Sequence, residues 1–220
     1  MIGVIDVGNT RYHCGIGEGL SVIKRMDTEH VEEVASFFEG IGDIMVISVA
    51  GRRLEPLRKY LEGRMIRFPM DIIEMDYTGL VGEDRIASAL YIRETGLYPC
   101  VLVDAGSAIT IDIINEGGMF SGGAILPGIR SYLSVFRFQE HLKDIKIEQK
   151  PLNRQGKNTV ECIRHGIYIY IKGIMDYVDT LNTKRVIVTG GDAHLFERKG
   201  WIYDRDIVLK GGLVATKFFT

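Results

Sequence analysis

The sequence has few cysteines and no long apolar run. The three cysteines, Cys14, Cys100 and Cys162, are odd in number and form no CxxC pair. This argues against a disulfide framework or a zinc site and favours a reducing compartment. No stretch of about 18 apolar residues is present, so we expect no transmembrane helix. The N-terminus also lacks the basic and long apolar segments of a signal peptide. We therefore expect a cytoplasmic protein without membrane contact.

An excess of basic residues is also missing. The chain has 27 Lys and Arg against 29 Asp and Glu, a formal net charge of −2, so we expect no nucleic-acid partner. GxxxxGKS/T, HExxH, GxSxG and strict GxGxxG patterns do not occur, which argues against P-loop, zincin, α/β-hydrolase and Rossmann chemistry. The five histidines show no spacing typical of metal ligands.

What the sequence has is a regular succession of apolar segments and 26 glycines. Alternating or short apolar runs predict strands near residues 1–7, 11–17, 20–26, 44–49, 65–68, 71–75, 101–104, 108–114, 119–125 and 186–188. Helical spacing predicts helices near residues 28–38, 54–61, 84–94, 128–142, 158–180, 192–199 and 210–219. Thr28 and Asp84 are the predicted N-caps of two of these helices. Clustered strands followed by alternation with helices predict an α/β protein with a mixed sheet.

The second half of the chain resembles the first. An apolar run ends in Asp6-Val-Gly8, and another ends in Asp104-Ala-Gly106; each is followed by small polar residues and a second strand. A repeat this long indicates a duplicated domain rather than a solenoid. We predict two similar domains, residues 1–97 and 98–220.

The turn that follows Asp6 is the first candidate site. A glycine-containing turn after a buried strand can present backbone N–H groups to phosphate oxygens. Asn9 and Thr10 add neutral donors, and Asp6 could hold a hydrated Mg²⁺. The alternative is a plain hairpin turn, because Asn and Thr also suit turns for local reasons.

The second candidate is the loop that begins at Asp104. A carboxylate at the end of a buried strand needs a cation or several hydrogen-bond donors. Ser107 and Thr110 carry hydroxyls that could donate to phosphate.

The segment Gly82-Glu-Asp84-Arg85 is the third candidate. Asp84 could accept a hydroxyl proton, and Arg85 could bind a carboxylate with two parallel hydrogen bonds. The alternative is an N-cap Asp beside a surface Arg. Three weaker glycine-containing motifs, each of which could be only a turn or a helix start, are Gly122–Gly128, Gly156–Thr159 and Thr189–Asp192.

Taken in order, these motifs resemble those of type III pantothenate kinases. The resemblance covers nearly the whole chain, from Asp6 to the 209–213 segment. It implies the acetate and sugar kinase/actin superfamily fold with two similar domains. It also implies transfer of the ATP γ-phosphate to the terminal hydroxyl of pantothenate, the first step of coenzyme A synthesis.

The resemblance further implies a set of site residues. Asp84 occupies the position of the proton acceptor, and Asp104 that of the ligand of a monovalent cation, K⁺ or NH₄⁺. Residues matching the Mg-ATP site are Asp6, Val7, Gly8, Asn9, Thr10, Arg11, Tyr12, His13 and Ser107. Residues matching the pantothenate site are Gly82, Glu83, Asp84, Arg85 and Thr159. Members of the family are homodimers, so we expect a homodimer.

One departure from the family pattern leaves other functions open. Family members often have a Tyr and then a Pro before the Gly-x-Asp-Arg motif, whereas here Tyr77 lies only five residues before Gly82 and the Pro is missing. The remaining alternatives are a kinase for another small hydroxylated acid and a nucleotide-binding regulatory protein of the same fold.

Overall fold

The chain folds into two compact units. The computed structural model describes residues 1–140, 142 and 150–219. The first unit is built from three segments, Met1–Tyr98, Ile114–Gly122 and the C-terminal segment from Asp206. The second is built from Pro99–Ile113 and Gly123–Arg205. The division into domains 1–97 and 98–220 stays a prediction.

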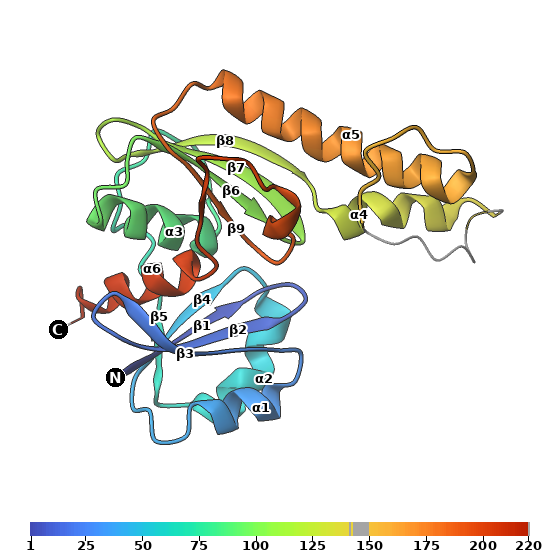
Figure 1. The fold of residues 1–220 in the computed structure, drawn as a ribbon. Helices are drawn as coiled ribbons and strands as arrows, with labels where there is room; N and C mark the ends of the chain where they lie inside the picture. Colours follow the sequence, from blue (N-terminus) through green and yellow to red (C-terminus); the bar gives the residue numbers. More distant parts are fainter. Residues whose placement is uncertain (141, 143–149, 220) are drawn as a thin grey trace. The chain divides into compact units, whose positions relative to one another are not determined.

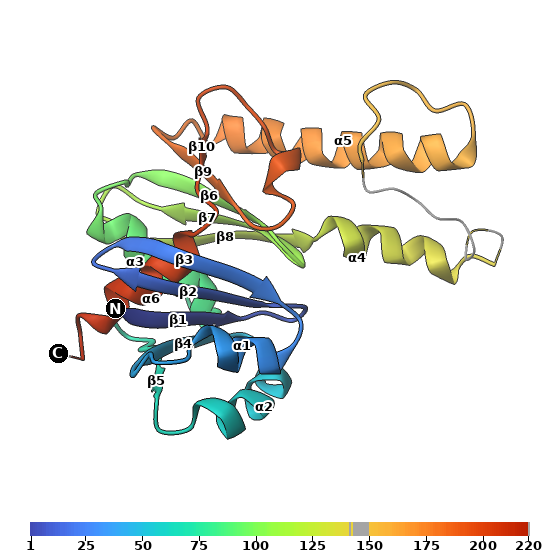
Figure 2. The same ribbon diagram turned by 60° about the horizontal axis from the view of Figure 1, so that its bottom comes forward.

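The first unit contains a five-stranded mixed sheet (Figure 2). Its strands are β1 (Ile2–Val7), β2 (Tyr12–Glu18), β3 (Ser21–Thr28), β4 (Ile44–Ser48) and β5 (Met65–Arg67). The order is β3-β2-β1-β4-β5. The β1–β2 and β2–β3 pairs are antiparallel, and the β1–β4 and β4–β5 pairs are parallel. The carboxyl ends of β1 and β4 therefore lie at the same edge, where open α/β sheets bind their ligands.

Two pairs of helices cover the two faces of this sheet (Figure 1). On one face lie α1 (Val31–Phe37) and α2 (Gly51–Leu61), whose apolar side chains bury Ile5, Val7 and Tyr12. On the other face lie α3 (Glu83–Glu94) and α6 (Ile207–Thr216). Because α6 is apolar almost all round, both the sheet and α3 can pack against it.

The second sheet repeats the strand order of the first. Its strands are β6 (Cys100–Ala105), β7 (Ala108–Ile114), β8 (Phe120–Pro127), β9 (Val186–Thr189) and β10 (Ile202–Tyr203). They are ordered β10-β9-β6-β7-β8. Read from β8, the order is β8-β7-β6-β9-β10, which matches β3-β2-β1-β4-β5 strand for strand. In both sheets the fourth strand along the chain, β4 or β9, is parallel to both of its neighbours. The repeated topology confirms the predicted duplication of an α/β unit.

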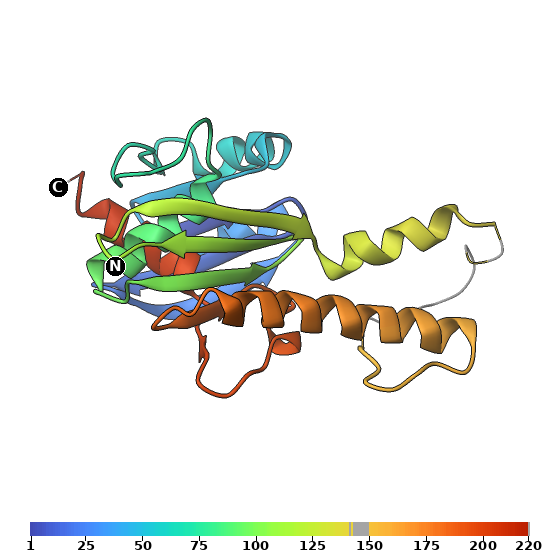
Figure 3. The same cartoon turned by 90° about the horizontal axis from the view of Figure 1, so that it is seen from above.

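The second unit also carries the longest helix described. α5 (Thr159–Thr180) runs beside α4 (Ile129–Ser134) and the 3-10 turn Val135–Phe138 that continues it (Figure 3). The rings of Tyr132 and Tyr170 stack with centroids 5.1 Å apart and join the two helices. In the described part of the chain, no helix has the length and apolar character needed to cross a membrane.

Several local predictions were wrong. Thr28 ends β3 instead of capping α1, which begins at Val31. Gly82 is the N-cap of α3, so Asp84 lies in its first turn. No strand forms at residues 71–75, where Met75 makes only an isolated bridge to Phe120.

Helix lengths also differ from those predicted. The helix predicted at residues 128–142 ends at Ser134 and continues as the 3-10 turn, and its residue 141 lies outside the described residues. The helix predicted at 192–199 is only a 3-10 turn, Ala193–Leu195. The last helix begins at Ile207 rather than near residue 210, and the short strand β10 was not predicted.

We predict that Gly211→Ala destabilises the first unit. A Cβ atom at Gly211 would overlap the carbonyl group of Ala87 on α3, so the two helices would have to separate. We expect the free energy of unfolding, measured in urea, to fall by about 3 kcal/mol. Gly173→Ala is the matched control, because a Cβ there meets nothing within 4 Å on α5. It should stabilise the chain by about 0.5–1 kcal/mol. Equal effects of the two changes would contradict the close helix contact.

Candidate active site

Asp6 lies near the carboxyl end of β1 with its side chain largely enclosed. Its Oδ1 atom is buried and has no hydrogen-bond partner. Burial raises the pKa of Asp6 to about 7, His13 opposes this shift, and Asp84 adds to it. A buried carboxylate oxygen without a partner is costly unless a cation or a donor arrives. Asp6 is therefore placed in an environment that favours a bound cation.

The turn after Asp6 is tight and exposed. The Gly8 N–H donates to the Arg11 carbonyl at 3.1 Å, which closes the turn around Asn9 and Thr10. The neighbouring Val7 and Tyr12 are buried in the core beneath α1 and α2. The Tyr12 hydroxyl donates to the Arg53 carbonyl at 2.9 Å, so its ring is engaged within the core. Val7 and Tyr12 can therefore offer a ligand only their backbone groups.

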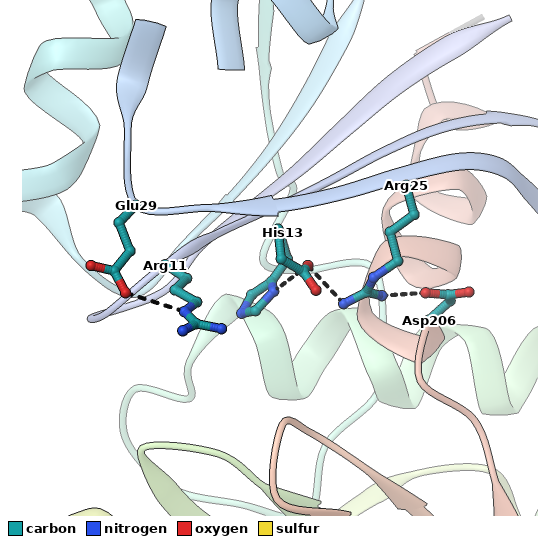
Figure 4. Close-up of polar contacts among 6 residues, drawn as sticks. Arg11, His13, Arg25, Glu29 and Asp206 are labelled. Atoms are coloured by element: carbon teal, nitrogen blue, oxygen red, sulfur yellow. Dashed lines mark hydrogen bonds and ion pairs between the residues drawn. The ribbon is translucent and has the colours of Figure 1, made fainter. Parts of the chain in front are cut away.

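His13 faces Asp6 across the β1–β2 pair and belongs to a row of interacting polar side chains (Figure 4). Its Nδ1 lies 2.8 Å from Asp27 Oδ1, and the same oxygen accepts a 2.9 Å hydrogen bond from Arg25. Arg25 also donates to Asp206, the residue before α6. Burial lowers the pKa of His13, but the Asp27 hydrogen bond and the charge of Asp6 outweigh it and raise the pKa above the usual value. A separate exposed ion pair joins Arg11 to Glu29 at 3.3 Å.

The start of α3 is fixed to the same edge of the sheet. Glu83 Oε2 accepts a 2.7 Å hydrogen bond from the Ser48 N–H, and Ser48 pairs with Val7 at the end of β1. Burial raises the pKa of Glu83, although the Ser48 N–H opposes the shift. Asp84 accepts from the Arg85 N–H at 2.8 Å and is close enough to Asp6 to raise its pKa. The two carboxylates predicted to act in phosphoryl transfer thus belong to one local site.

Arg85 lies beside the aromatic rings of Tyr77 and Phe120, and Phe120 belonged to none of the sequence motifs. Its guanidinium carbon is 5.1 Å from the Phe120 ring centroid and 5.9 Å from that of Tyr77. The two rings meet edge to face at 5.7 Å. Gly122 has a φ of +73°, and a Cβ there would lie 2.8 Å from the Tyr77 ring. Gly122 therefore makes room for Tyr77, which the structure brings next to Arg85 despite its short distance from Gly82 in the sequence.

In the second unit, two glycine motifs converge on the loop after Asp104. Gly190 has a φ of +94°, and a Cβ there would lie 2.5 Å from both Asp104 Oδ1 and the Ala105 carbonyl oxygen. A Cβ at Gly128 would overlap the carbonyl groups of Gly106 and Ser107. Glycine at both positions is required for the backbone to enclose this loop. The enclosed Asp104 and backbone oxygens are donors of the kind that hard cations bind.

Thr159 lies apart from this loop in the described contacts, at the first residue of α5. The side chain of Asn158 caps the helix by accepting from the Glu161 N–H at 3.0 Å. Glu161 in turn accepts from the Lys157 N–H at 3.0 Å. This arrangement is a variant of the capping box, in which the Glu161 side chain binds the residue before the N-cap instead of the N-cap itself. It explains the Gly156–Thr159 motif locally and leaves the Thr159 hydroxyl on an exposed helix end.

The donor set suits cations bound together with phosphate rather than a closed metal centre. Among the described residues, no group of three or more His, Cys, Asp or Glu side chains could hold a metal ion. Mg²⁺ in phosphoryl-transfer sites needs only one or two carboxylates, with phosphate and water completing its shell. The partnerless oxygen of Asp6 fits such an ion.

Comparison with known proteins identifies the family. Residues 4–180 match the family described as type III pantothenate kinase. The chain belongs to this family. A type III pantothenate kinase of Dehalococcoides mccartyi is 30% identical over 94% of this chain and 93% of its own length.

Solved structures share the fold of this chain. A Campylobacter jejuni protein described as a Baf family transcriptional activator is 27% identical, with a TM-score of 0.70, and the match covers 99% of this chain and 98% of that one. An Arthrobacter polyphosphate/ATP-glucomannokinase has a TM-score of 0.52 at 14% identity, covering 100% of this chain and 99% of that one, and so shares the fold alone. The expected acetate and sugar kinase/actin superfamily fold is thus confirmed for this type III pantothenate kinase family member.

Several site features were not visible in the family motifs. The alternation of side chains along β3 could have placed Arg25 and Asp27 on one face. Nothing local in the sequence links them to Asp206, which is 181 residues from Arg25. Phe120 likewise meets Tyr77 and Arg85 only after the chain has folded.

We predict that Asp6→Asn changes how stability depends on pH. Asp6 has a pKa of about 7 in the folded chain, against an ordinary value of 3.8 for an exposed aspartate. Between these values the folded state holds a proton that the unfolded state releases, so the free energy of unfolding falls as the pH rises through this window. Asp6→Asn removes that fall.

In urea unfolding, the stability of Asp6→Asn relative to the wild type should rise by about 2.5 kcal/mol from pH 5 to pH 8. Asp43→Asn, which removes an exposed carboxylate, is the control and should leave the pH dependence as in the wild type. Parallel pH profiles for the wild type and Asp6→Asn would show that Asp6 is not perturbed.

Proposed function

We propose that this chain phosphorylates pantothenate to 4′-phosphopantothenate with ATP, the first step of coenzyme A biosynthesis. The observation that carries the proposal is the match to the type III pantothenate kinase family over residues 4–180. That match spans the Asp6 turn, the Gly82–Arg85 segment and the Asp104 loop. The charge of Asp84 raises the pKa of Asp6, so the two carboxyl groups lie near each other. This proximity supports a common role in phosphoryl transfer.

In the proposed reaction, the terminal hydroxyl oxygen of pantothenate attacks the γ-phosphorus of ATP. A new P–O bond forms, the bond from the γ-phosphorus to the bridging oxygen breaks, and ADP leaves with that electron pair. Asp84 orients the hydroxyl and accepts its proton as general base. Phosphoryl transfer requires mainly positioning and charge neutralisation. The positive end of the α3 helix dipole beside Asp84 is consistent with a carboxylate in that place.

Substrate binding is assigned to the segment that precedes and begins α3. Gly82 and Glu83 hold this segment against β4, as the Glu83–Ser48 hydrogen bond indicates. Arg85 binds the pantothenate carboxylate through its planar guanidinium. We add Tyr77 to the pantothenate site because its ring lies beside Arg85. Thr159 is proposed as a further substrate contact on the strength of the motif alone.

Nucleotide binding is assigned to the turn of residues 6–13 and to Ser107. The backbone N–H groups of the turn and the side chains of Asn9 and Thr10 would donate to the phosphates. Asp6 would hold the hydrated Mg²⁺ of Mg-ATP, and Asp104 a monovalent cation, K⁺ or NH₄⁺. When bound, these ions offset the negative charge of the triphosphate.

We also propose a cytoplasmic homodimer. The three free cysteines fit a reducing compartment. Val135 and Phe138 on the 3-10 turn after α4 and Ile169 on α5 are exposed, Phe138 at 89%. Exposed apolar side chains that gather on one part of a protein are typical of an interface. The mass in solution, compared with 24.7 kDa for the single chain, tests this proposal.

The decisive experiment measures ADP release by the purified chain with Mg-ATP, with and without pantothenate, in potassium and in sodium salts. We expect release that requires pantothenate and is faster in potassium. Release with another hydroxylated acid instead would indicate a kinase of different specificity. ATP binding without turnover of any such acid would favour the regulatory function suggested by the description of the Campylobacter relative.

We predict that Asp84→Asn abolishes turnover and preserves ATP binding. The Asn side-chain oxygen can still accept from the Arg85 N–H, so the start of α3 should be retained. The amide cannot take up the hydroxyl proton, and kcat should fall by about 100-fold or more. Glu94→Gln, which removes an exposed carboxylate at the other end of α3, is the control and should retain turnover. A kcat for Asp84→Asn within about twofold of the wild type would remove Asp84 from the role of base.

A further inference from the structure

Three polar residues form a row across neighbouring strands of the first sheet. Asp6 on β1 pairs with His13 on β2, and His13 pairs with Asp27 on β3. Directly opposed residues in antiparallel strands project from the same face of a sheet. Gly15, two positions after His13, faces Leu209 of α6, so the row lies on the face covered by α3 and α6. The site carboxylate of Asp6 is therefore one end of a polar row.

The row continues from β3 to the start of α6. Arg25 lies two positions before Asp27 on the same face, and it is paired with Gly15, which has no side chain to obstruct it. Its guanidinium bridges Asp27 and Asp206 (Figure 4). The side chains of Arg25 and Asp27 are only 18% and 19% exposed. A partly buried guanidinium that binds two carboxylates keeps a more fixed geometry than an ion pair on the exposed surface.

The consequence for His13 is a fixed ring orientation. Asp27 accepts at Nδ1, so this nitrogen carries a hydrogen and the opposite Nε2 edge is directed away from Asp27. Asp27 itself cannot rotate freely, because Arg25 binds the same oxygen. Carboxylates that orient a histidine through its second nitrogen set both its ring plane and its proton arrangement.

We propose that Asp27, anchored by Arg25 and Asp206, is a positioning residue that directs the His13 imidazole toward the phosphates of bound Mg-ATP. His13 lies beside Asp6, at the base of the turn assigned to the phosphates, so the Nε2 edge that Asp27 leaves open is the edge that can face them. When Nε2 also carries a hydrogen, it adds a donor there. Asp27 touches no ligand in this scheme and acts only through His13. The inference rests on the proposed nucleotide site and extends it to residues outside the turn.

The test is a double-mutant cycle on Mg-ATP affinity, measured by calorimetry with Asp27→Asn, His13→Gln and the double variant. Each single change should weaken binding by about fivefold to tenfold, the effect of one hydrogen bond to a charged group. The double variant should bind within about twofold of His13→Gln alone, because Asp27 has no route to ATP without His13. Single effects that multiply in the double variant, or an Asp27→Asn variant that binds ATP as the wild type does, would overturn the proposal.

A second readout separates positioning from general stabilisation. The ring nitrogen resonances of His13, assigned with His13→Gln, should shift when Mg-ATP is added to the wild type. In Asp27→Asn that shift should be reduced. An unchanged response of the His13 ring in Asp27→Asn would also overturn the proposal.

Two further variants complete the design. Glu94→Gln removes an ion-paired carboxylate on α3 about 15 Å along the helix from Asp84, and it should leave ATP affinity unchanged.

If Asp27→Asn does not fold, Asp206→Asn replaces it in the cycle. This change weakens the ion pair that holds Arg25 and leaves both partners of the His13–Asp27 hydrogen bond in place. A smaller loss of affinity, again absent in the His13→Gln background, is then expected, and a loss that persists in that background would overturn the proposal.

Binding rather than turnover is measured so that the two proposals can fail separately. A wild-type chain that binds Mg-ATP but does not phosphorylate pantothenate would refute the proposed function and leave the positioning role to be decided by the cycle. A wild-type chain that does not bind Mg-ATP would overturn both.

Discussion

The first unit is organised around one costly feature, the buried carboxylate of Asp6. Its Oδ1 atom lacks a hydrogen-bond partner, and the charged form is disfavoured enough to bring the pKa to about 7. A carboxyl group in this position lowers the free energy of unfolding at neutral pH. Features that lower stability in this way are typical of functional sites, and the rest of the structure compensates for them. The carboxyl ends of β1 and β4, the start of α3 and the polar row through His13 all lie near Asp6 at one edge of the sheet.

Close backbone approach is the second constraint. Gly211 lets α6 contact α3, and Gly122 makes room for the ring of Tyr77. Gly128 and Gly190 let two segments of the second unit enclose the Asp104 loop. Three of the glycines in the candidate ligand motifs, Gly122, Gly128 and Gly190, are therefore required by the packing of the protein itself. The ligand loops depend on that packing for their shape.

The structure also separates residues that a motif groups together. Within Asp6–His13, alternate side chains point to opposite faces, so Val7 and Tyr12 enter the core while Asp6 and His13 face α3 and α6. Within Gly82–Arg85, Glu83 is held by the Ser48 N–H and Arg85 lies by two aromatic rings. Each motif therefore combines residues that shape the site with residues that can act in it.

The sequence by itself determined most of the strands and helices, the duplication and the resemblance to the family. These follow from local apolar periodicity and from short motifs, which depend on neighbouring residues in the chain. Local periodicity failed at Thr28 and Asp84, where the helix start was set by contacts with other elements. The sheet register alone brought Asp27 to His13 and Asp6, and the return of the chain as α6 brought Asp206 to Arg25. These contacts were decided only by the tertiary structure, because strand pairing and helix packing join residues whose distance along the chain carries no local signal.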